Sequence, residues 1–112
     1  MKKIEAIIRP SKVEELKLAL DKLEVRGMTI YDVMGRGLQR GQKQIFRGQE
    51  HTVDLYPKVK MEVICRDHWA DRIIETILTV CNTGNIGDGK IFVYPVARAV
   101  RIRTGEQDDQ AL

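Results

Sequence analysis

A glycine-rich segment in the last third of the chain carries the clearest chemical signal in this 112-residue sequence. Residues 82–90 include Gly84, Gly87 and Gly89 and end on Lys90. Glycines allow backbone N–H groups to turn towards an anion without obstruction from side chains, and Lys90 supplies the opposite charge. The spacing is not that of a Walker A motif, which needs four residues between its glycines and a Ser or Thr after the lysine. The segment alone therefore fits either a phosphate-binding loop or a surface turn between a helix and a strand.

A pair of arginines, Arg101 and Arg103, follows some ten residues later along the chain. If this segment is a strand, both guanidinium groups lie on one face and Ile102 lies on the other. Two neighbouring guanidinium groups clamp phosphate strongly, because each can donate two hydrogen bonds to oxygen atoms. Two solvated arginines are the alternative. Taken together with the glycine-rich loop, the pair favours a polyphosphate site.

Weaker candidates lie elsewhere in the chain. The glycines of Gly35-Arg36-Gly37 permit an unusual backbone path, and Gln39 nearby offers a side-chain oxygen. Asp88 is interpreted as a residue that caps or positions the glycine-rich loop rather than as a catalytic base. His51 and His68 have no recognisable Ser, Cys or Asp partner, so no nucleophile–base pair is visible in the sequence.

The elements that must position these residues form two similar halves. Each half has a strand with alternating apolar residues, a helix with apolar residues at helical spacing, and a second strand. The predicted strands are Lys3–Ile8, Met28–Gly35, Val59–Cys65 and Ile91–Val96, the first helix is about Lys12–Glu24, the second helix follows Asp67, and Val100–Arg103 is a short fifth strand.

The predicted helices have recognisable boundaries. Ser11 and Glu14 form the S-x-x-E capping-box pattern at the start of the first helix, and Gly27 is expected to stop that helix. Asp67 is expected to cap the second helix. The inner face of the second helix is predicted to consist of Ala70, Ile73, Ile74, Ile77, Leu78 and Cys81.

The element order predicts an α+β fold of the ferredoxin-like βαββαβ type, with two helices on one face of an antiparallel sheet. We expect residues 1–112 to form a single domain, with a long loop over 37–55 that lacks any sustained periodicity and a mobile tail over 104–112. The other face of the sheet must be covered, and a subunit interface is the simplest way to cover it.

Composition excludes several functional classes. Aromatic residues are only 5% of the chain, which argues against a surface built for base stacking, and the net charge of +3 fits an anionic small ligand. No stretch reaches the roughly 18–20 apolar residues of a spanning helix, and no signal peptide is visible. Cys65 and Cys81 lie in apolar patterns without CxxC spacing, so we expect reduced, buried thiols; a disulfide or a metal pair is the alternative.

Several segments together resemble the PII nitrogen-regulatory family, and the resemblance runs along nearly the whole chain. The most specific stretch is Thr83-x-x-x-Gly87-Asp88-Gly89-Lys90-Ile91-Phe92-Val93-x-x-Val96. It is joined by Lys3-Ile4-Glu5-Ala6-Ile7-Ile8-Arg9-Pro10, Gly37, Gln39, Arg47-Gly48, Lys58, Arg101 and Arg103.

The resemblance implies a homotrimer with nucleotide sites in the clefts between subunits. ATP or ADP would be the regulatory ligand, Mg²⁺ would accompany ATP, and 2-oxoglutarate would be the effector. Nucleotide-binding positions carried over are Ile7, Thr29, Gly37, Leu38, Gln39, Ile64, Gly87, Asp88, Gly89, Lys90, Arg101 and Arg103. Gln39 would coordinate the metal, and Gln39, Lys58 and Gly87 would bind 2-oxoglutarate.

The long loop would be the family's T-loop, which docks onto target proteins. Arg47 would dock onto a partner, and an ammonium transporter, glutamine synthetase or a transcriptional regulator are the candidate targets. The protein would be cytoplasmic and recruited to the membrane only through a transporter, and it would not bind nucleic acid. Leu38 replaces a common phosphate-contacting arginine, which leaves the preference between ATP and ADP open. His51 replaces a tyrosine that is nucleotidylated in relatives, and Gln49 a serine that is phosphorylated in some, so we expect neither modification.

Two other functions are compatible with parts of the sequence. An RNA-binding module of similar layout would need aromatic residues on its central strands, and the predicted strands offer only Tyr31, Phe92 and Tyr94. A small nucleotide-using enzyme would need a catalytic pair that the sequence does not show. A regulatory sensor without a catalytic role is the favoured interpretation.

Overall fold

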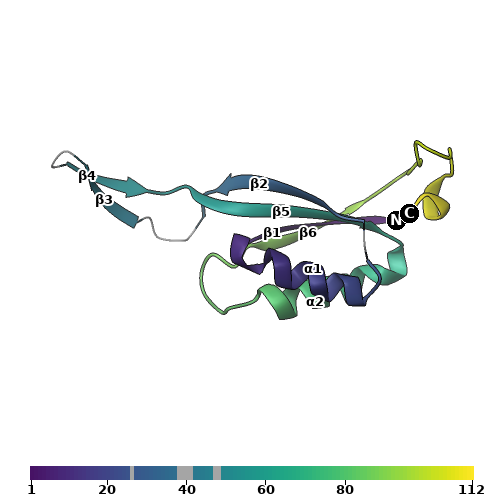
Figure 1. The fold of residues 1–112 in the computed structure, drawn as a ribbon, viewed down its shortest axis with the longest axis horizontal. Coiled ribbons are helices and arrows are strands. Elements are labelled where there is room, and N and C mark those ends of the chain that lie inside the picture. Colours follow the sequence, from purple (N-terminus) through teal and green to yellow (C-terminus); the bar gives the residue numbers. More distant parts are fainter. Residues whose placement is uncertain (26, 38–41, 47–48) are drawn as a thin grey trace.

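The structure, a computed structural model, describes residues 1–25, 27–37, 42–46 and 49–112. A four-stranded antiparallel sheet has two helices packed on one of its faces (Figure 1). The strand order β2-β5-β1-β6 is that of a ferredoxin-like fold, as predicted. The elements are β1 (Lys2–Ile8), α1 (Val13–Lys22), β2 (Thr29–Gly35), β3 (Gln42–Phe46), β4 (Gln49–Val53), β5 (Tyr56–Cys65), α2 (Ala70–Cys81) and β6 (Lys90–Pro95), with short 3-10 helices at Pro10–Lys12, Asp67–Trp69 and Asp108–Ala111.

The two central strands, β1 and β5, supply half of the core because their side chains alternate between the two faces of the sheet. Every second residue of each strand points towards the helices, and the register pairs Ile4 with Val63 and Ala6 with Met61. The helices close this layer with Leu16 and Leu20 of α1. The buried core comprises Ile4, Ala6, Ile8, Leu16, Leu20, Val59, Met61, Val63, Cys65, Ala70, Ile73, Ile77 and Cys81.

Helix α1 begins and ends differently from the prediction. The Ser11–Glu14 capping box does not form, because Pro10–Lys12 make a turn of 3-10 helix and Lys12 occupies the N-cap position without a side-chain hydrogen bond. The helix ends at Lys22, with Leu23 as its C-cap, so it stops before the predicted end at Glu24 and before Gly27. Glu24 has a left-handed φ of 62°, and the backbone N–H of Val25 donates to the carbonyl of Leu20 at 3.0 Å. This is the Schellman pattern, formed here without glycine.

Helix α2 also departs from the prediction in two details. Asp67 does not cap it: residues 67–69 form a 3-10 turn, and the Asp67 carboxylate instead lies 2.8 Å from the backbone amine of Met1. Leu78 was expected on the inner face but is 53% exposed, since the buried stripe runs through Ala70, Ile73, Ile77 and Cys81.

The segment over residues 37–55 contains regular structure that its sequence did not predict. Strands β3 and β4 pair as a separate two-stranded antiparallel sheet, which extends beyond the end of the main sheet (Figure 1). This ribbon contributes to the long axis of 60 Å, against 27 and 21 Å for the other two axes.

The predicted fifth strand over Val100–Arg103 is wrong. A single bridge joins Val100 to Gln107, and residues 102–104 form a turn that projects the fully exposed Ile102 into solvent. The backbone N–H of Arg101 donates to the carbonyl of Glu106 at 2.8 Å. The segment over residues 104–112 carries the short helix Asp108–Ala111, and its mobility stays a prediction.

The sheet face opposite the helices carries an interlocked set of charges. Lys3 and Lys60 lie 3.8 and 4.0 Å from Glu62, and Lys60 lies 3.6 Å from Glu5. Tyrosines on the two edge strands close the set, since Tyr94 donates to Glu5 at 2.8 Å and Tyr31 donates to Glu62 at 3.3 Å. The two positive and two negative charges of this set are paired with one another, so a second chain could cover these four side chains without leaving any of them unpaired.

Candidate functional site

An open cleft of about 530 Å³ lies at the end of the sheet where β1 and β5 meet the glycine-rich loop. This volume is in the range of small-molecule sites. The cleft brings together the end of β1, the end of β2, the beginning of β5 and the glycine-rich loop. Its lining includes the predicted site residues Ile7, Gly37, Lys58, Gly87, Asp88, Gly89 and Lys90, together with Gly35, Arg36, Asn85, Ile86 and Phe92.

Two glycines of the loop are required by the backbone path and by the close packing of the loop on β1. Gly87 and Gly89 have φ values of 107° and 98°, a region that L side chains rarely adopt. A Cβ atom at Gly89 would overlap the carbonyl oxygen of Ile7 at 1.6 Å. Glycine is therefore needed at position 89 both for its backbone conformation and for lack of space. Strand β6 begins at the next residue, Lys90.

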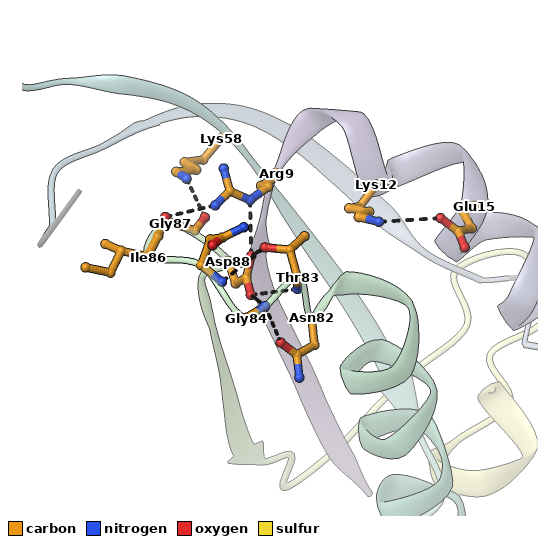
Figure 2. A network of polar contacts seen from close by, with 11 residues as sticks. Arg9, Lys12, Glu15, Lys58, Asn82, Thr83, Gly84, Ile86, Gly87 and Asp88 are labelled. Atoms are coloured by element: carbon orange, nitrogen blue, oxygen red, sulfur yellow. Dashed lines mark hydrogen bonds and ion pairs between the residues drawn. The ribbon is translucent and has the colours of Figure 1, made fainter. Parts of the chain in front are cut away.

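Asp88 is the centre of the loop's own hydrogen bonds, and Figure 2 shows its carboxylate turned towards the start of the loop. It accepts from the backbone N–H of Thr83 at 2.8 Å, from the Thr83 hydroxyl at 2.5 Å and from the backbone N–H of Gly84 at 3.0 Å. The bonds from Thr83, followed by those from Arg9 and Gly84, hold the pKa of this carboxyl well below its usual range. Asp88 is therefore ionised at neutral pH, and its carboxylate oxygens accept hydrogen bonds from within the loop.

Two basic side chains from other elements also hold the loop (Figure 2). Arg9, at the end of β1, lies 3.1 Å from the Asp88 carboxylate and donates to the carbonyl of Ile86 at 2.9 Å. Lys58 of β5 donates to the carbonyl of Gly87 at 2.6 Å. Burial lowers the pKa of Lys58, Arg9 lowers it further, and Asp88 opposes the shift. Arg36, Lys58 and Lys90 line the cleft with Asp88, and Arg9 lies behind the loop, so positive charge is in excess and favours an anionic ligand.

Of the other predicted residues in the sheet, Ile64 lies towards the end away from the cleft, and Thr29 lies beside the middle of the two central strands. Thr29 pairs with Glu62 and Ile64 pairs with Lys3, whereas Ile7 of the cleft pairs with Lys60 and Lys90. Lys3 and Ile7 are four positions apart on β1, which corresponds to about 13 Å along a strand. The C-terminal segment with Arg101 and Arg103 also lies at this far end, away from the glycine-rich loop (Figure 1).

The predicted site is thus divided into two half-sites within one chain. The first comprises Ile7, Gly37, Lys58 and residues 87–90. The second comprises Thr29, Ile64, Arg101 and Arg103. Arg101 of the second half-site lies 3.2 Å from the carboxylate of Glu106. The expected strand that would align Arg101 with Arg103 is absent, so the two arginines are carried by a turn instead.

Three predicted residues cannot be placed. Leu38, Gln39 and Arg47 lie outside the described residues. The metal contact predicted for Gln39 and the docking role predicted for Arg47 therefore remain predictions. Within the described part of the chain, no group of three or more His, Cys, Asp or Glu side chains could hold a metal ion.

Sequence reasoning missed Arg9 and Thr83 as parts of the site. Both occur in the motifs that carried the family resemblance, yet neither was assigned a role. Arg9 is separated from Asp88 by 79 positions, so no local spacing links them. Thr83 could have been found from its place five residues before Asp88 at the start of a loop, where a hydroxyl often pairs with a nearby carboxylate.

Comparisons with known proteins show which family the sequence matches. The family described as Nitrogen regulatory protein P-II matches residues 1–106. The chain is 49% identical over all 112 residues to the nitrogen regulatory protein P-II of Klebsiella oxytoca and to the nitrogen regulatory protein P-II 1 of Escherichia coli K12. The same identity is found with the P-II protein of Pasteurella multocida, and in each case both chains are covered completely.

Proposed function

Because the chain belongs to the nitrogen regulatory protein P-II family, we propose that it transmits nitrogen status by binding ATP or ADP and, together with Mg-ATP, 2-oxoglutarate. Proteins of this family are regulators rather than enzymes, in agreement with the interpretation favoured from the sequence. The observation that carries the proposal is the cleft that Ile7, Lys58 and the glycine-rich loop form, with its excess of positive charge.

The nucleotide phosphates would lie against the glycine-rich loop. The positive φ values of Gly87 and Gly89 orient the peptide groups in a way that suits an anion-binding loop, and Lys90 lies beside them. Ile7 and Phe92 give the cleft an apolar wall for the adenine ring. The low pKa of Asp88 does not conflict with this assignment, because its carboxylate is turned into the loop and paired with Arg9.

A complete nucleotide site would require two chains. The half-site with Arg101 and Arg103 lies at the far end of the chain from the cleft (Figure 1), so a second copy must bring it to the first half-site. In a ring of three copies, each cleft receives the arginines of the neighbouring chain, so all three sites are complete. The exposed apolar residues of the two edge strands, Ile30 and Met34 on β2 and Val93 on β6, support such an assembly, as do the mutually paired charges on the open face.

The effector would bind beside the phosphates. Lys58 lines the cleft and could pair with a carboxylate of 2-oxoglutarate. A dianion next to a polyphosphate is repelled unless a metal bridges the two, so we expect 2-oxoglutarate to bind only when Mg-ATP is present. The described side chains offer no metal-binding cluster of their own, so the phosphates and Gln39 would hold Mg²⁺.

Two features concern partner proteins. The β3–β4 ribbon extends beyond the sheet (Figure 1), as expected of a segment that docks onto a target. We propose that Arg47 in this segment contacts the partner, with an ammonium transporter as the first candidate and glutamine synthetase or a transcriptional regulator as others. Within the described residues, no helix is long and apolar enough to cross a membrane, so a cytoplasmic protein would reach the membrane through its partner.

The open face does not favour the RNA-binding alternative. Tyr31, Phe92 and Tyr94 lie on the edge strands β2 and β6, while the middle of the central strands presents Glu5 and Glu62. RNA-binding sheets stack bases on aromatic residues of central strands. The hydroxyls of Tyr31 and Tyr94 are also hydrogen-bonded to these glutamates. Two carboxylates at the centre of the face would repel a phosphate backbone.

Mixed oligomers test the division of the site between chains. Lys90→Ala removes a cation from the first half-site, and the double change Arg101→Ala with Arg103→Ala disables the second. Each variant alone is expected to lose ATP binding. Random mixing of equal amounts should restore about one quarter of all sites, and about one third of the sites in rings of three that hold both variants, since a complete site needs the loop half of one variant and the arginine half of the other.

The readout is the number of ATP sites per chain, measured by equilibrium dialysis on oligomers co-purified through two different tags. Arg72→Ala, which alters an exposed arginine on α2, is the matched control and should bind ATP normally. If mixed oligomers bind no ATP, the two half-sites do not cooperate between chains. If the unchanged protein binds no ATP at all, the nucleotide proposal itself fails.

A further inference from the structure

The ion pair between Arg9 and Asp88 joins the end of β1 to the glycine-rich loop. Arg9 is not among the residues predicted to contact a ligand. The two side chains of the ion pair are only 25% and 22% exposed, and the Nε–Oδ1 distance is 3.1 Å. The same guanidinium donates through Nη2 to the carbonyl of Ile86 at 2.9 Å. Arg9 therefore holds the loop at a side chain and at the backbone simultaneously (Figure 2).

The Asp88 carboxylate needs a cationic partner because Asp88 lies in the lining of the cleft. Its carboxylate organises the start of the loop by accepting from Thr83 and Gly84, while its own backbone is part of the cleft that would receive phosphates. An unpaired carboxylate at this position would repel a polyphosphate. Arg9 is the basic side chain within ion-pair distance of Asp88 in the described part of the chain.

We propose that Arg9 is a positioning residue of the nucleotide site, an inference that rests on the proposed function. Arg9 does not line the cleft and acts through Asp88 and Ile86. It neutralises the carboxylate that shapes the loop, and it fixes the peptide preceding Gly87 in the orientation that accepts phosphate. Its contribution is electrostatic as well as geometric, so it should grow with the charge of the ligand.

The variant Arg9→Gln tests this inference directly. It leaves the Asp88 carboxylate ionised and without its cation, and we expect the affinity for ATP to fall about tenfold or more. The loss of affinity should decrease from ATP to ADP to AMP, because each nucleotide in this order carries fewer negative charges for the Asp88 carboxylate to repel. The measurement is isothermal titration of each nucleotide, with circular dichroism and light scattering to verify fold and oligomeric state.

The double variant Arg9→Gln with Asp88→Asn separates charge from shape. An amide at position 88 can accept from the backbone N–H groups of Thr83 and Gly84 and donate to the hydroxyl of Thr83 and to the glutamine, so the network is satisfied without charge. We expect ATP affinity to return to within about threefold of the unchanged protein. Arg72→Gln on α2 is the matched control for loss of a surface arginine and should leave ATP affinity unchanged.

Three results would overturn the inference while the nucleotide proposal stands. These are unchanged ATP affinity in Arg9→Gln, an equal loss for ATP, ADP and AMP, or a double variant no better than the single one. If Arg9→Gln does not fold, Arg9→Lys replaces it: an ammonium can pair with Asp88 but cannot reach the Ile86 carbonyl as well, so ATP affinity should fall about threefold. Unchanged affinity in Arg9→Lys would then contradict the inference.

Discussion

At the scale of single residues, burial controls the chemistry of the two cysteines. Cys65 and Cys81 both lie in the core, and both are free. Burial raises the pKa of the Cys65 thiol and raises that of Cys81 to about 11. Because the thiolate is the reactive form, both side chains are structural and unreactive at neutral pH. The sequence predicted this from their apolar surroundings alone.

Alkylation measures this protection. With a pKa of about 11, only about one Cys81 thiol in a thousand is ionised at pH 8, and the side chain is also inaccessible. We therefore expect iodoacetamide to modify neither cysteine in the native protein and both in guanidinium chloride, as followed by intact mass. The thiol introduced by Glu75→Cys on the exposed face of α2 is the positive control. Native modification of Cys81 at the rate of this control would show that the core opens readily.

Single residues also show where sequence reasoning stops. Asp88 was predicted both to position the glycine-rich loop and to contact nucleotide; its hydrogen bonds with Thr83 and Gly84 agree with the first role, and the second stays a prediction. Its long-range partner Arg9 could not be found from spacing, because the contact depends on how β1 and the loop meet in space. The sequence predicted that the loop needs glycines for its backbone path. It could not predict that a Cβ atom at position 89 would overlap the carbonyl oxygen of Ile7.

At the scale of elements, alternation and helical spacing predicted the main sheet and both helices, because burial on one face imposes the period directly. Helix ends were less predictable. Ser11 and Asp67 are good capping residues in isolation, yet short 3-10 turns precede both helices and take those residues out of the cap position. The β3–β4 ribbon pairs apart from the main sheet, and the sequence over residues 37–55 has no sustained apolar period from which to predict it.

The end of α1 gives a prediction at this scale. Glu24 adopts a left-handed φ of 62° that costs about 1 kcal/mol for a residue other than glycine. Glu24→Gly should therefore raise the free energy of unfolding by about 0.5–1 kcal/mol, the gain being reduced by the greater freedom of glycine in the unfolded chain. Urea unfolding of both proteins at equal concentration measures the difference.

The matched control is Glu15→Gly in the first turn of the same helix. There glycine replaces a residue with normal helical geometry, and stability should fall by about 1 kcal/mol. The ion pair of Glu15 with Lys12 spans 3.8 Å at the surface and contributes little to this difference. A Glu24→Gly variant that is destabilised as much as Glu15→Gly would show that the Glu24 side chain makes a stabilising contact.

At the scale of the whole molecule, the distribution of the site over two ends of the chain is the main result. The resemblance to the family supplied the residues of both half-sites, but only the fold separates Arg101 and Arg103 from the loop that they were expected to complete. The predicted strand over 100–103 failed because residues 102–104 turn back instead of pairing beyond the single bridge at Val100. The trimer follows from these positions as a proposal, since one chain alone cannot bring its two half-sites together.

Calorimetric titration of 2-oxoglutarate into the purified protein, with Mg-ATP, with Mg-ADP and with neither, tests the central claim most directly. We predict binding heat only in the presence of Mg-ATP, because the γ-phosphate and its metal are needed to hold the effector beside Lys58. Equal binding heat in all three conditions would contradict the proposed coupling between nucleotide and effector. Absence of heat in all three, with ATP also failing to bind, would show that the chain keeps the P-II fold without its ligand switch.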